Sequence, residues 1–169
     1  MFWKIFVTTL ILIVNMNRTV FAQTPTRLNQ FDYWGAYSYN ANKNTVCYIL
    51  SIPTDQAPST VKHGDNFFLI TKRLGPGKTV TFEPQFMAGY NLREHSYVNV
   101  KIGAQNFSLF TKGASAWMDM TEGEANLVAA MKAGVSMTVK AISQRGTNTT
   151  YTFLLKGVTA AVNAIQKCQ

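Results

Sequence analysis

The sequence predicts a mainly β protein: an antiparallel β-sandwich with two short helices, the second of them at the C-terminus. Three observations lead to this prediction. Several segments alternate apolar and polar residues, as strands with one buried face do. Short turns that contain glycine separate these segments. Two other segments repeat apolar residues three and four positions apart, which is typical of amphipathic helices.

Strand prediction rests on the alternation of side chains along each segment. In residues 95–102, for example, Val98, Val100 and Ile102 share the face that we expect to be buried. The predicted strands are residues 45–52, 66–74, 79–83, 95–102, 105–112, 135–141 and 149–155. Turns between them are expected at Gly75-Pro76-Gly77, Gly103-Ala104 and Arg145-Gly146-Thr147. Short strands at this spacing favour a sandwich.

Aromatic residues dominate residues 31–40, where an extended chain would put Trp34 on one face and a row of tyrosines on the other. If Trp34 is inside, then Tyr33, Tyr37 and Tyr39 are partly exposed and form a possible binding surface. The alternative is that the tyrosines pack in the core or against the sheet surface.

The two predicted helices cover residues 122–132 and 158–167. Thr121 and Glu124 have the spacing of a capping box at the start of the first helix, and Gly134 is expected to end it in a left-handed conformation. The second helix places its apolar residues on one face, and the last cysteine points the same way; these residues are Val158, Ala161, Val162, Ile165 and Cys168.

Length and composition indicate one folded domain. The chain has 169 residues, of which 47% are hydrophobic, and its 16 Lys+Arg against 8 Asp+Glu give a net charge of +8. With only two cysteines, these values exclude a disordered chain, a coiled coil, a zinc module with several cysteines and a disulfide-dense miniprotein.

The N-terminus predicts export. Lys4 precedes an apolar run at residues 5–14, and Ala22 ends a possible cleavage site, which is the layout of a signal peptide over residues 1–22. A membrane anchor is the alternative, but this run is too short to cross a bilayer, and no later stretch is long enough. We expect a flexible leader at residues 23–30, one domain at residues 31–169, and a location in the periplasm or outer cell envelope, or secretion.

Cys47 lies within a predicted strand and Cys168 near the C-terminus. Two cysteines in an exported protein favour a disulfide, which would tie the last helix to the sheet. Two free buried thiols and a redox pair are the alternatives, and the long separation does not favour the redox pair.

No catalytic, cofactor or metal site is predicted. His63 and His95 have no metal-binding partner at nearby positions. The segment Gly75–Thr79 is similar to the end of a phosphate-binding loop, but Lys72 stands where the first glycine should be. A periplasmic enzyme with a site assembled from distant residues is one alternative, and a carrier with an apolar cavity between the sheets is another.

Basic residues gather at one predicted turn. Lys72, Arg73 and Lys78 flank the Gly-Pro-Gly turn and would make a positive hairpin tip. Such a tip could contact an unidentified protein or an anionic component of the envelope or host surface. Ordinary solubilising charge is the alternative. Nucleic acid is not an expected partner, because the chain is predicted to be exported and has no helix-in-groove motif.

Five motifs, in order along the chain, resemble the invasion-associated locus B family. They are Phe31-x-x-Trp34-Gly35-Ala36-Tyr37-Ser38-Tyr39, Val46-Cys47-Tyr48-Ile49-Leu50-Ser51, Phe107-x-Leu109-Phe110-Thr111-Lys112-Gly113 with Ala116-Trp117, Leu127-Val128-Ala129-Ala130-Met131-Lys132-x-Gly134, and Arg145-Gly146-Thr147-x-Thr149-Thr150 with Leu155–Ala161. Together they span most of the chain from Phe31 to Cys168.

This resemblance implies an immunoglobulin-like β-sandwich in an exported bacterial protein of the periplasm or cell envelope. It also implies a role in the invasion of host cells, notably erythrocytes, and it offers no catalytic residues to carry over. We therefore expect a non-enzymatic envelope protein, without a cofactor, that binds a protein or an envelope component.

Overall fold

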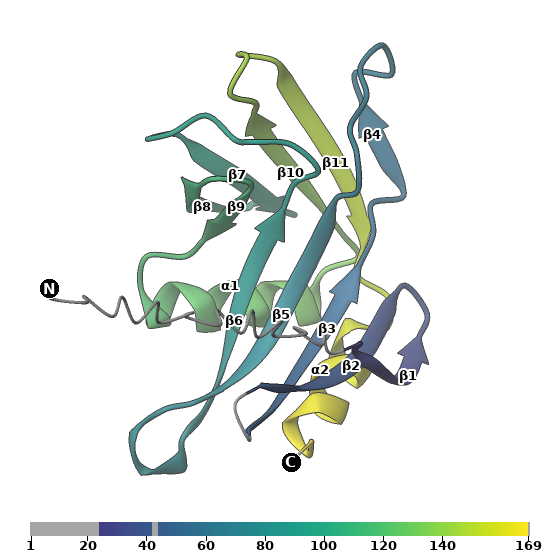
Figure 1. Ribbon diagram of the computed structural model, residues 1–169, viewed down its shortest axis with the longest axis vertical. Coiled ribbons are helices and arrows are strands. Elements are labelled where there is room, and N and C mark those ends of the chain that lie inside the picture. The colour runs from purple at the N-terminus through teal and green to yellow at the C-terminus, as the bar shows by residue number, and fades with distance from the viewer. Residues whose placement is uncertain (1–23, 42–43, 169) are drawn as a thin grey trace, which may run out of the picture.

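The computed structural model describes residues 24–41 and 44–168 (Figure 1). These residues form eleven strands and two α-helices. The strands are β1 Thr26–Phe31, β2 Trp34–Ala41, β3 Asn44–Ser51, β4 Asp55–Ala57, β5 Phe67–Leu74, β6 Val80–Met87, β7 Tyr97–Ile102, β8 Gln105–Lys112, β9 Ser115–Trp117, β10 Ser136–Ile142 and β11 Asn148–Leu154. The helices are α1 Thr121–Ala133 and α2 Val158–Gln166. The mainly β fold with a second, C-terminal helix is thus confirmed.

All strand pairs are antiparallel and form one sheet, in the order β1-β2-β3-β5-β6-β9-β8-β7-β10-β11-β4. The sheet folds over so that its two halves pack face to face. Phe68 of β5 lies edge-on to Phe153 of β11, with ring centroids 5.9 Å apart, and Phe86 of β6 lies 5.5 Å from Tyr151. The two layers of the sandwich are therefore joined through the short strand β9.

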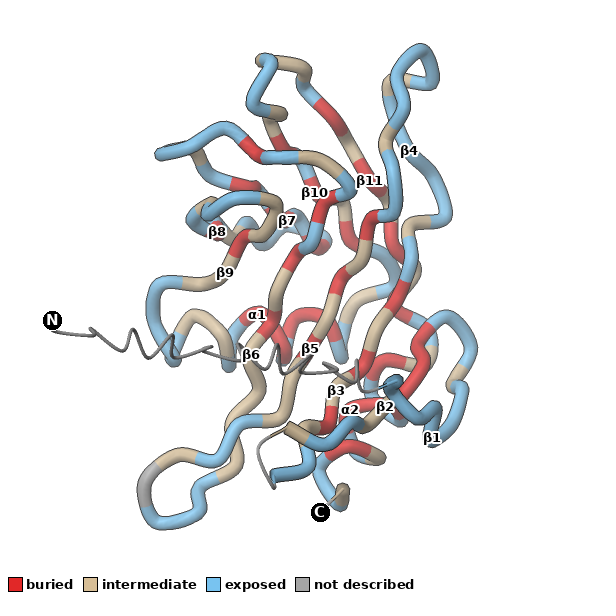
Figure 2. The backbone as a smooth tube through the Cα atoms, viewed as in Figure 1, coloured by how far each residue is buried: buried red, intermediate tan, exposed pale blue. Residues whose placement is uncertain are grey.

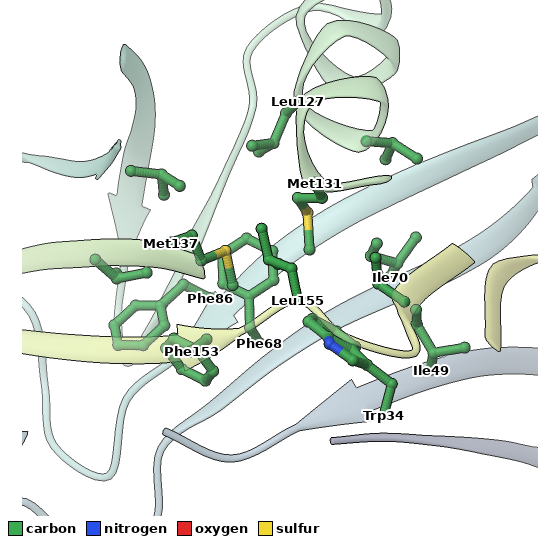
Figure 3. Close-up of a cluster of buried hydrophobic side chains, with 14 of the residues drawn as sticks. Trp34, Ile49, Phe68, Ile70, Phe86, Leu127, Met131, Met137, Phe153 and Leu155 are labelled. Atoms are coloured by element: carbon green, nitrogen blue, oxygen red, sulfur yellow. The ribbon is translucent and has the colours of Figure 1, made fainter. Parts of the chain in front are cut away.

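The core lies between these layers and under the helices (Figure 2, Figure 3). Val98, Val100 and Ile102 are buried on one face of β7, as their alternation predicts. From α1, Leu127 and Met131 point into the same cluster (Figure 3). Each strand with a clear alternation therefore contributes its apolar face to one continuous core.

The ends of α1 correct two predictions. Met120 is the N-cap residue, no side chain caps the helix, and Thr121 is already its first residue, so no capping box forms. Gly134 is extended, with φ −86° and ψ 167°, rather than left-handed. A glycine is needed there for close packing, because a Cβ atom would lie 2.6 Å from Cγ2 of Ile102 and 2.9 Å from Cδ1 of Leu155.

The second helix packs against β2 and β3 and follows the predicted stripe. Val158, Ala161, Val162 and Ile165 are buried. Gly157 precedes the helix with φ 96°, a conformation that favours glycine.

The predicted leader at residues 23–30 needs a correction. Residues from Thr26 to Phe31 form β1, an edge strand that pairs with β2 around an irregularity between Arg27 and Asn29. Four of its six residues are polar and all but Phe31 are exposed, so the strand shows no buried apolar face and depends on backbone pairing. The predicted signal peptide, residues 1–22, lies outside the described residues. Among the described helices, none is long and apolar enough to cross a membrane.

Candidate functional site

Cys47 and Cys168 form a disulfide, with a Cα–Cα distance of 6.2 Å. Cys47 is buried in β3, and Cys168 follows α2. The predicted bridge between the sheet and the last helix is thus confirmed. Lys72 strengthens the same connection, because its Nζ donates a hydrogen bond to the backbone oxygen of Cys168 at 2.6 Å. A cation near the end of a helix also complements the helix dipole.

The hairpin between β5 and β6 does not carry three free positive charges. Lys72 is directed to the end of the chain, and Arg73 forms an ion pair with Glu83 at 2.6 Å. The hydrogen bond from Arg73 to Glu83 is the main cause that raises the pKa of Arg73. Lys78 is exposed, its ammonium group forms no ion pair with another described residue, and Leu74 on the same hairpin is 67% exposed. The tip is therefore less positive than its composition suggests.

Trp34 is fully buried, and its indole nitrogen donates to the backbone oxygen of Leu154 at 3.0 Å. The tyrosines of β2 consequently lie on the outer face of the sheet. Tyr37 is half-buried, and Tyr39 is exposed. Of the two arrangements that the sequence allows, the structure has the one with Trp34 inside.

A third tyrosine, Tyr48 of β3, joins Tyr37 and Tyr39. It is paired directly opposite Tyr37, and their rings stack at 5.4 Å with an interplanar angle of 19°. Tyr39 meets Tyr48 edge-on at 6.0 Å. Burial, followed by the neighbouring phenols of Tyr37 and Tyr39, raises the pKa of Tyr48, so Tyr48 is uncharged at neutral pH. We call Tyr37, Tyr39 and Tyr48 the tyrosine face.

The tyrosine face continues toward the hairpin tip. Tyr48 is paired with Thr71 of β5, and Thr71 with Glu83 of β6, so one row of residues crosses four strands. Arg73 lies close enough to Tyr39 for the phenol to favour its charged form. The tyrosine face and the hairpin tip, which were predicted as separate surfaces, are therefore neighbours in the fold. Tyr33 does not join them: it lies in the β1–β2 turn, where its backbone nitrogen donates to Lys156.

A second set of aromatic residues, two exposed and one half-buried, follows the other half of the sheet. Tyr97 of β7 is paired with Phe110 of β8, and Phe110 with Trp117 of β9. Tyr97 is 59% exposed, and the rings of Phe110 and Trp117 lie 5.9 Å apart. We call these three residues the aromatic row. The alternation along each strand does not reveal this row, because only the strand register brings its members together.

His63 lies in a surface pocket of about 550 Å³, and His95 is exposed, with φ 55°. The ring nitrogens of His63 are 2.9 Å from the carbonyl oxygen of Pro58 and 3.0 Å from the hydroxyl of Tyr151. Because a carbonyl only accepts, Nε2 donates to Pro58 and Nδ1 faces Tyr151. Both nitrogens are therefore engaged, and neither contacts a serine or a carboxylate.

This geometry bears on the two alternatives that the sequence leaves open, an enzyme and a small-molecule carrier. Within the described part of the chain, no group of three or more His, Cys, Asp or Glu side chains could hold a metal ion. Phe68, Phe86 and Tyr151 fill the space between the layers, where a carrier would need an apolar cavity. The pocket beside His63 supplies the concavity that an enzyme needs, but its imidazole has no reactive partner.

Comparisons with known proteins agree with these observations. The family model described as "Invasion associated locus B (IalB) protein" matches residues 34–166. The structure is similar to the crystal structure of invasion associated protein b from Bartonella henselae, with a TM-score of 0.56 and 12% sequence identity. The similarity covers 82% of this chain and 94% of that chain, and at this identity it shows a shared fold. No curated protein sequence matches the chain.

Proposed function

Since the chain belongs to the invasion associated locus B family, we propose that it is an exported, non-enzymatic envelope protein that binds another protein through its tyrosine face. In a bacterium that enters host cells, this contact would assist the invasion of those cells, erythrocytes included. The observation that carries the proposal is the cluster of Tyr37, Tyr39 and Tyr48 on the outer sheet surface.

Tyrosine suits a protein interface because its ring buries a large area and its hydroxyl remains able to form hydrogen bonds. The tyrosine face is not needed to fill the core, since Trp34 and the inward residues of β3 already do so. The rings also hold one another in place, which lowers the entropy that they would lose on binding.

The charges near this face favour a protein as partner over an anionic surface. Arg73 is neutralised by Glu83, and Lys72 is used at the end of the chain. Lys78 is then the basic residue of the tip that remains available, and one exposed lysine gives little affinity for an anionic membrane or glycan.

Two further observations support export and the absence of catalysis. The Cys47–Cys168 disulfide is typical of an oxidising compartment, such as the periplasm or the cell exterior. The imidazole of His63 is committed to Pro58 and Tyr151, which leaves it without the free nitrogen of a general base.

Deletion and complementation in the native bacterium test this function. The deletion strain would be complemented with the native chain, with the double variant Tyr39→Ala/Tyr48→Ala, or with Tyr97→Ala from the aromatic row as matched control. We expect the native chain and the control to restore envelope integrity and host-cell entry, and the double variant to fail. Full restoration by the double variant, or a deletion with no defect, would contradict the proposal.

A further inference from the structure

The pocket beside His63 lies at the other end of the molecule from the hairpin tip. Three segments form it: residues 58–66 after β4, residues 88–96 between β6 and β7, and the turn between β10 and β11 (Figure 1, top). Its volume of about 550 Å³ falls within the range of small-molecule sites. The lining residues are Val61, Lys62, His63, Tyr90, Asn91, Ser143, Gln144, Arg145, Thr147 and Thr149.

Buried hydrogen bonds hold the first two segments together. The side chain of Asn66 is 3% exposed and donates to the backbone oxygens of His63 at 3.1 Å and Gly64 at 3.0 Å. Its own oxygen accepts from the backbone nitrogen of Gly89 at 3.2 Å. Gly64 and Gly89 pack so closely that a Cβ on Gly89 would lie 2.5 Å from the backbone nitrogen of Asp65.

Backbone hydrogen bonds fix the third segment to the second. Gln144 donates its backbone N–H to Asn91 at 2.8 Å, and Arg93 donates its own to Ile142 at 2.9 Å. Leu92 and Ser143 also form an isolated β-bridge. The walls of the pocket are thus assembled before any ligand arrives, which reduces the ordering cost of binding.

A chain of hydrogen bonds fixes the side chains at the base of the pocket. The hydroxyl of Tyr90 lies 2.6 Å from Oγ1 of Thr149 and 3.0 Å from the hydroxyl of Tyr151, which in turn contacts His63. Thr149 is buried and donates to the backbone oxygen of Ala141 at 3.3 Å. These groups satisfy one another. By contrast, the side-chain amides of Asn91 and Gln144 have no hydrogen-bond partner among the described residues and are available to a ligand.

The pocket has basic side chains and no carboxylate among its lining residues. Lys62 and Arg145 lie on its exposed rim, and neither forms an ion pair with another described residue. Arg93 adds a further positive charge nearby, because its guanidinium lies against Gly146 in the β10–β11 turn. This excess of positive charge favours an anion.

We propose that this pocket binds a small hydroxylated anion of monosaccharide size, such as a sugar acid or a sugar phosphate. Lys62 and Arg145 bind its carboxylate or phosphate, where the guanidinium can donate two parallel hydrogen bonds. The side-chain amides of Asn91 and Gln144 bind its hydroxyl groups. The pocket is separate from the tyrosine face, so this proposal does not depend on whether the tyrosine face binds a protein.

Titration of the disulfide-bonded, isotope-labelled chain, followed by amide NMR shifts, tests this proposal. The probes are glucuronate and glucose 6-phosphate, with glucose and inorganic phosphate as controls. We expect saturable shifts at Asn91 and Gln144 with at least one of the two sugar anions, and weaker binding of both controls. The sugar anion that binds more tightly shows whether the site prefers a carboxylate or a phosphate.

Matched variants complete the test. Arg145→Gln should weaken binding about tenfold, because it removes a charged hydrogen-bond donor. Lys101→Gln removes the same charge from the exposed surface of β7, outside the pocket, and should leave the affinity unchanged. The proposal is overturned if no sugar anion binds more tightly than about 1 mM, if either control probe binds equally well, or if the two variants weaken binding equally.

Discussion

Tyr48 joins Tyr37 and Tyr39 into one cluster on the sheet surface, although it comes from the neighbouring strand. The sequence places Tyr37 and Tyr39 on one strand, but only the register of β3 adds a third ring between them. The alternation of β3 contains part of this information, because Cys47 and Ile49 are buried and Tyr48 must face the other way. Which tyrosine lies opposite it depends on strand pairing, which period-two alternation does not specify.

Stacking between Tyr37 and Tyr48 gives a first prediction at the residue scale. We expect a double-mutant cycle with Tyr37→Ala and Tyr48→Ala, each of which removes one of the stacked rings, to show a coupling of about 0.5–1 kcal/mol in the free energy of unfolding. Urea denaturation measures it. The same cycle with Tyr33→Ala in place of Tyr37→Ala should show no coupling, because Tyr33 lies apart from the tyrosine face.

Tyr151 gives a second prediction, which concerns pH. Burial and the hydrogen bond with Tyr90 raise the pKa of Tyr151 above its usual value near 10. The folded state therefore keeps the neutral phenol, whereas the unfolded state ionises first. This contribution to stability is complete below about pH 10 and is lost as the pH rises toward the folded-state pKa.

Comparison with Tyr151→Phe isolates this effect. Near pH 8 the variant should be less stable by about 1 kcal/mol for its lost hydrogen bonds. Above about pH 10 the native chain should lose stability more steeply than the variant, so that the difference between them shrinks. Urea unfolding at a series of pH values measures it, and two parallel curves would contradict the account.

At the scale of elements, the disulfide secures α2 to the sheet. Cys47 and Cys168 are 121 positions apart, so the bond closes a long loop in the unfolded chain. We expect Cys47→Ala/Cys168→Ala to lower the free energy of unfolding by about 2–5 kcal/mol. Hydrogen exchange should show the amides of α2 losing protection before those of β10 and β11. Unchanged stability, or loss of protection that begins in the sheet, would contradict this role.

The two glycines at either end of α1 give a matched pair of variants. Gly134→Ala should destabilise the protein by about 1–3 kcal/mol, because its Cβ would meet Ile102 and Leu155 inside the packed core. Gly123→Ala should be neutral or stabilising, because alanine favours a helix and its Cβ would meet only the flexible end of Met118. Thermal unfolding measures both, and equal effects would show that packing does not require glycine at residue 134.

Strands and helices were predictable where one face is buried, because apolar residues then recur at a regular spacing along the sequence. The long strands β3, β5, β7, β8, β10 and β11 and both helices follow this rule. β4 and β9 have three residues each, too few to show alternation, and β1 is an exposed edge strand without an apolar face. The predicted capping box fails because α1 already begins at Thr121, so that Met120 and not Thr121 is the N-cap residue.

The candidate site was predictable only in part, because the partners of its side chains depend on the fold. Basic residues near a turn can be counted in a sequence, but their partners cannot. Lys72 and Arg73 belong to the predicted positive tip, yet one binds the end of the chain and the other binds Glu83. Cys47 and Cys168 were predictable as a pair because the chain offers no other cysteine.

At the scale of the whole molecule, the fold separates two surfaces. The tyrosine face and hairpin tip lie on the half of the sheet formed by β2, β3, β5 and β6, whereas the pocket lies among the β10–β11 turn and the neighbouring loops (Figure 1). A protein partner and a small ligand could therefore be bound together. Export also concerns the whole molecule, because the compartment of the protein determines which partners it can meet.

Export gives a prediction for the full chain. We expect the exported protein to begin at Gln23, since the signal peptide is predicted to end at Ala22. N-terminal sequencing of the chain from the periplasmic or secreted fraction checks this. A chain that lacks residues 1–22 should remain in the cytoplasm with reduced cysteines, and recovery of the uncleaved chain from the cytoplasm alone would contradict export.

Photo-cross-linking in living cells of the native bacterium is the most direct test of the central claim that the tyrosine face binds a protein. A photoreactive phenylalanine analogue would replace Tyr39, with Tyr97 in the aromatic row and the exposed Lys140 on β10 as comparison positions. We predict a discrete protein adduct from position 39 and none from position 140. An adduct from position 97 alone would move the interface to the aromatic row, and no protein adduct from position 39 would contradict the claim.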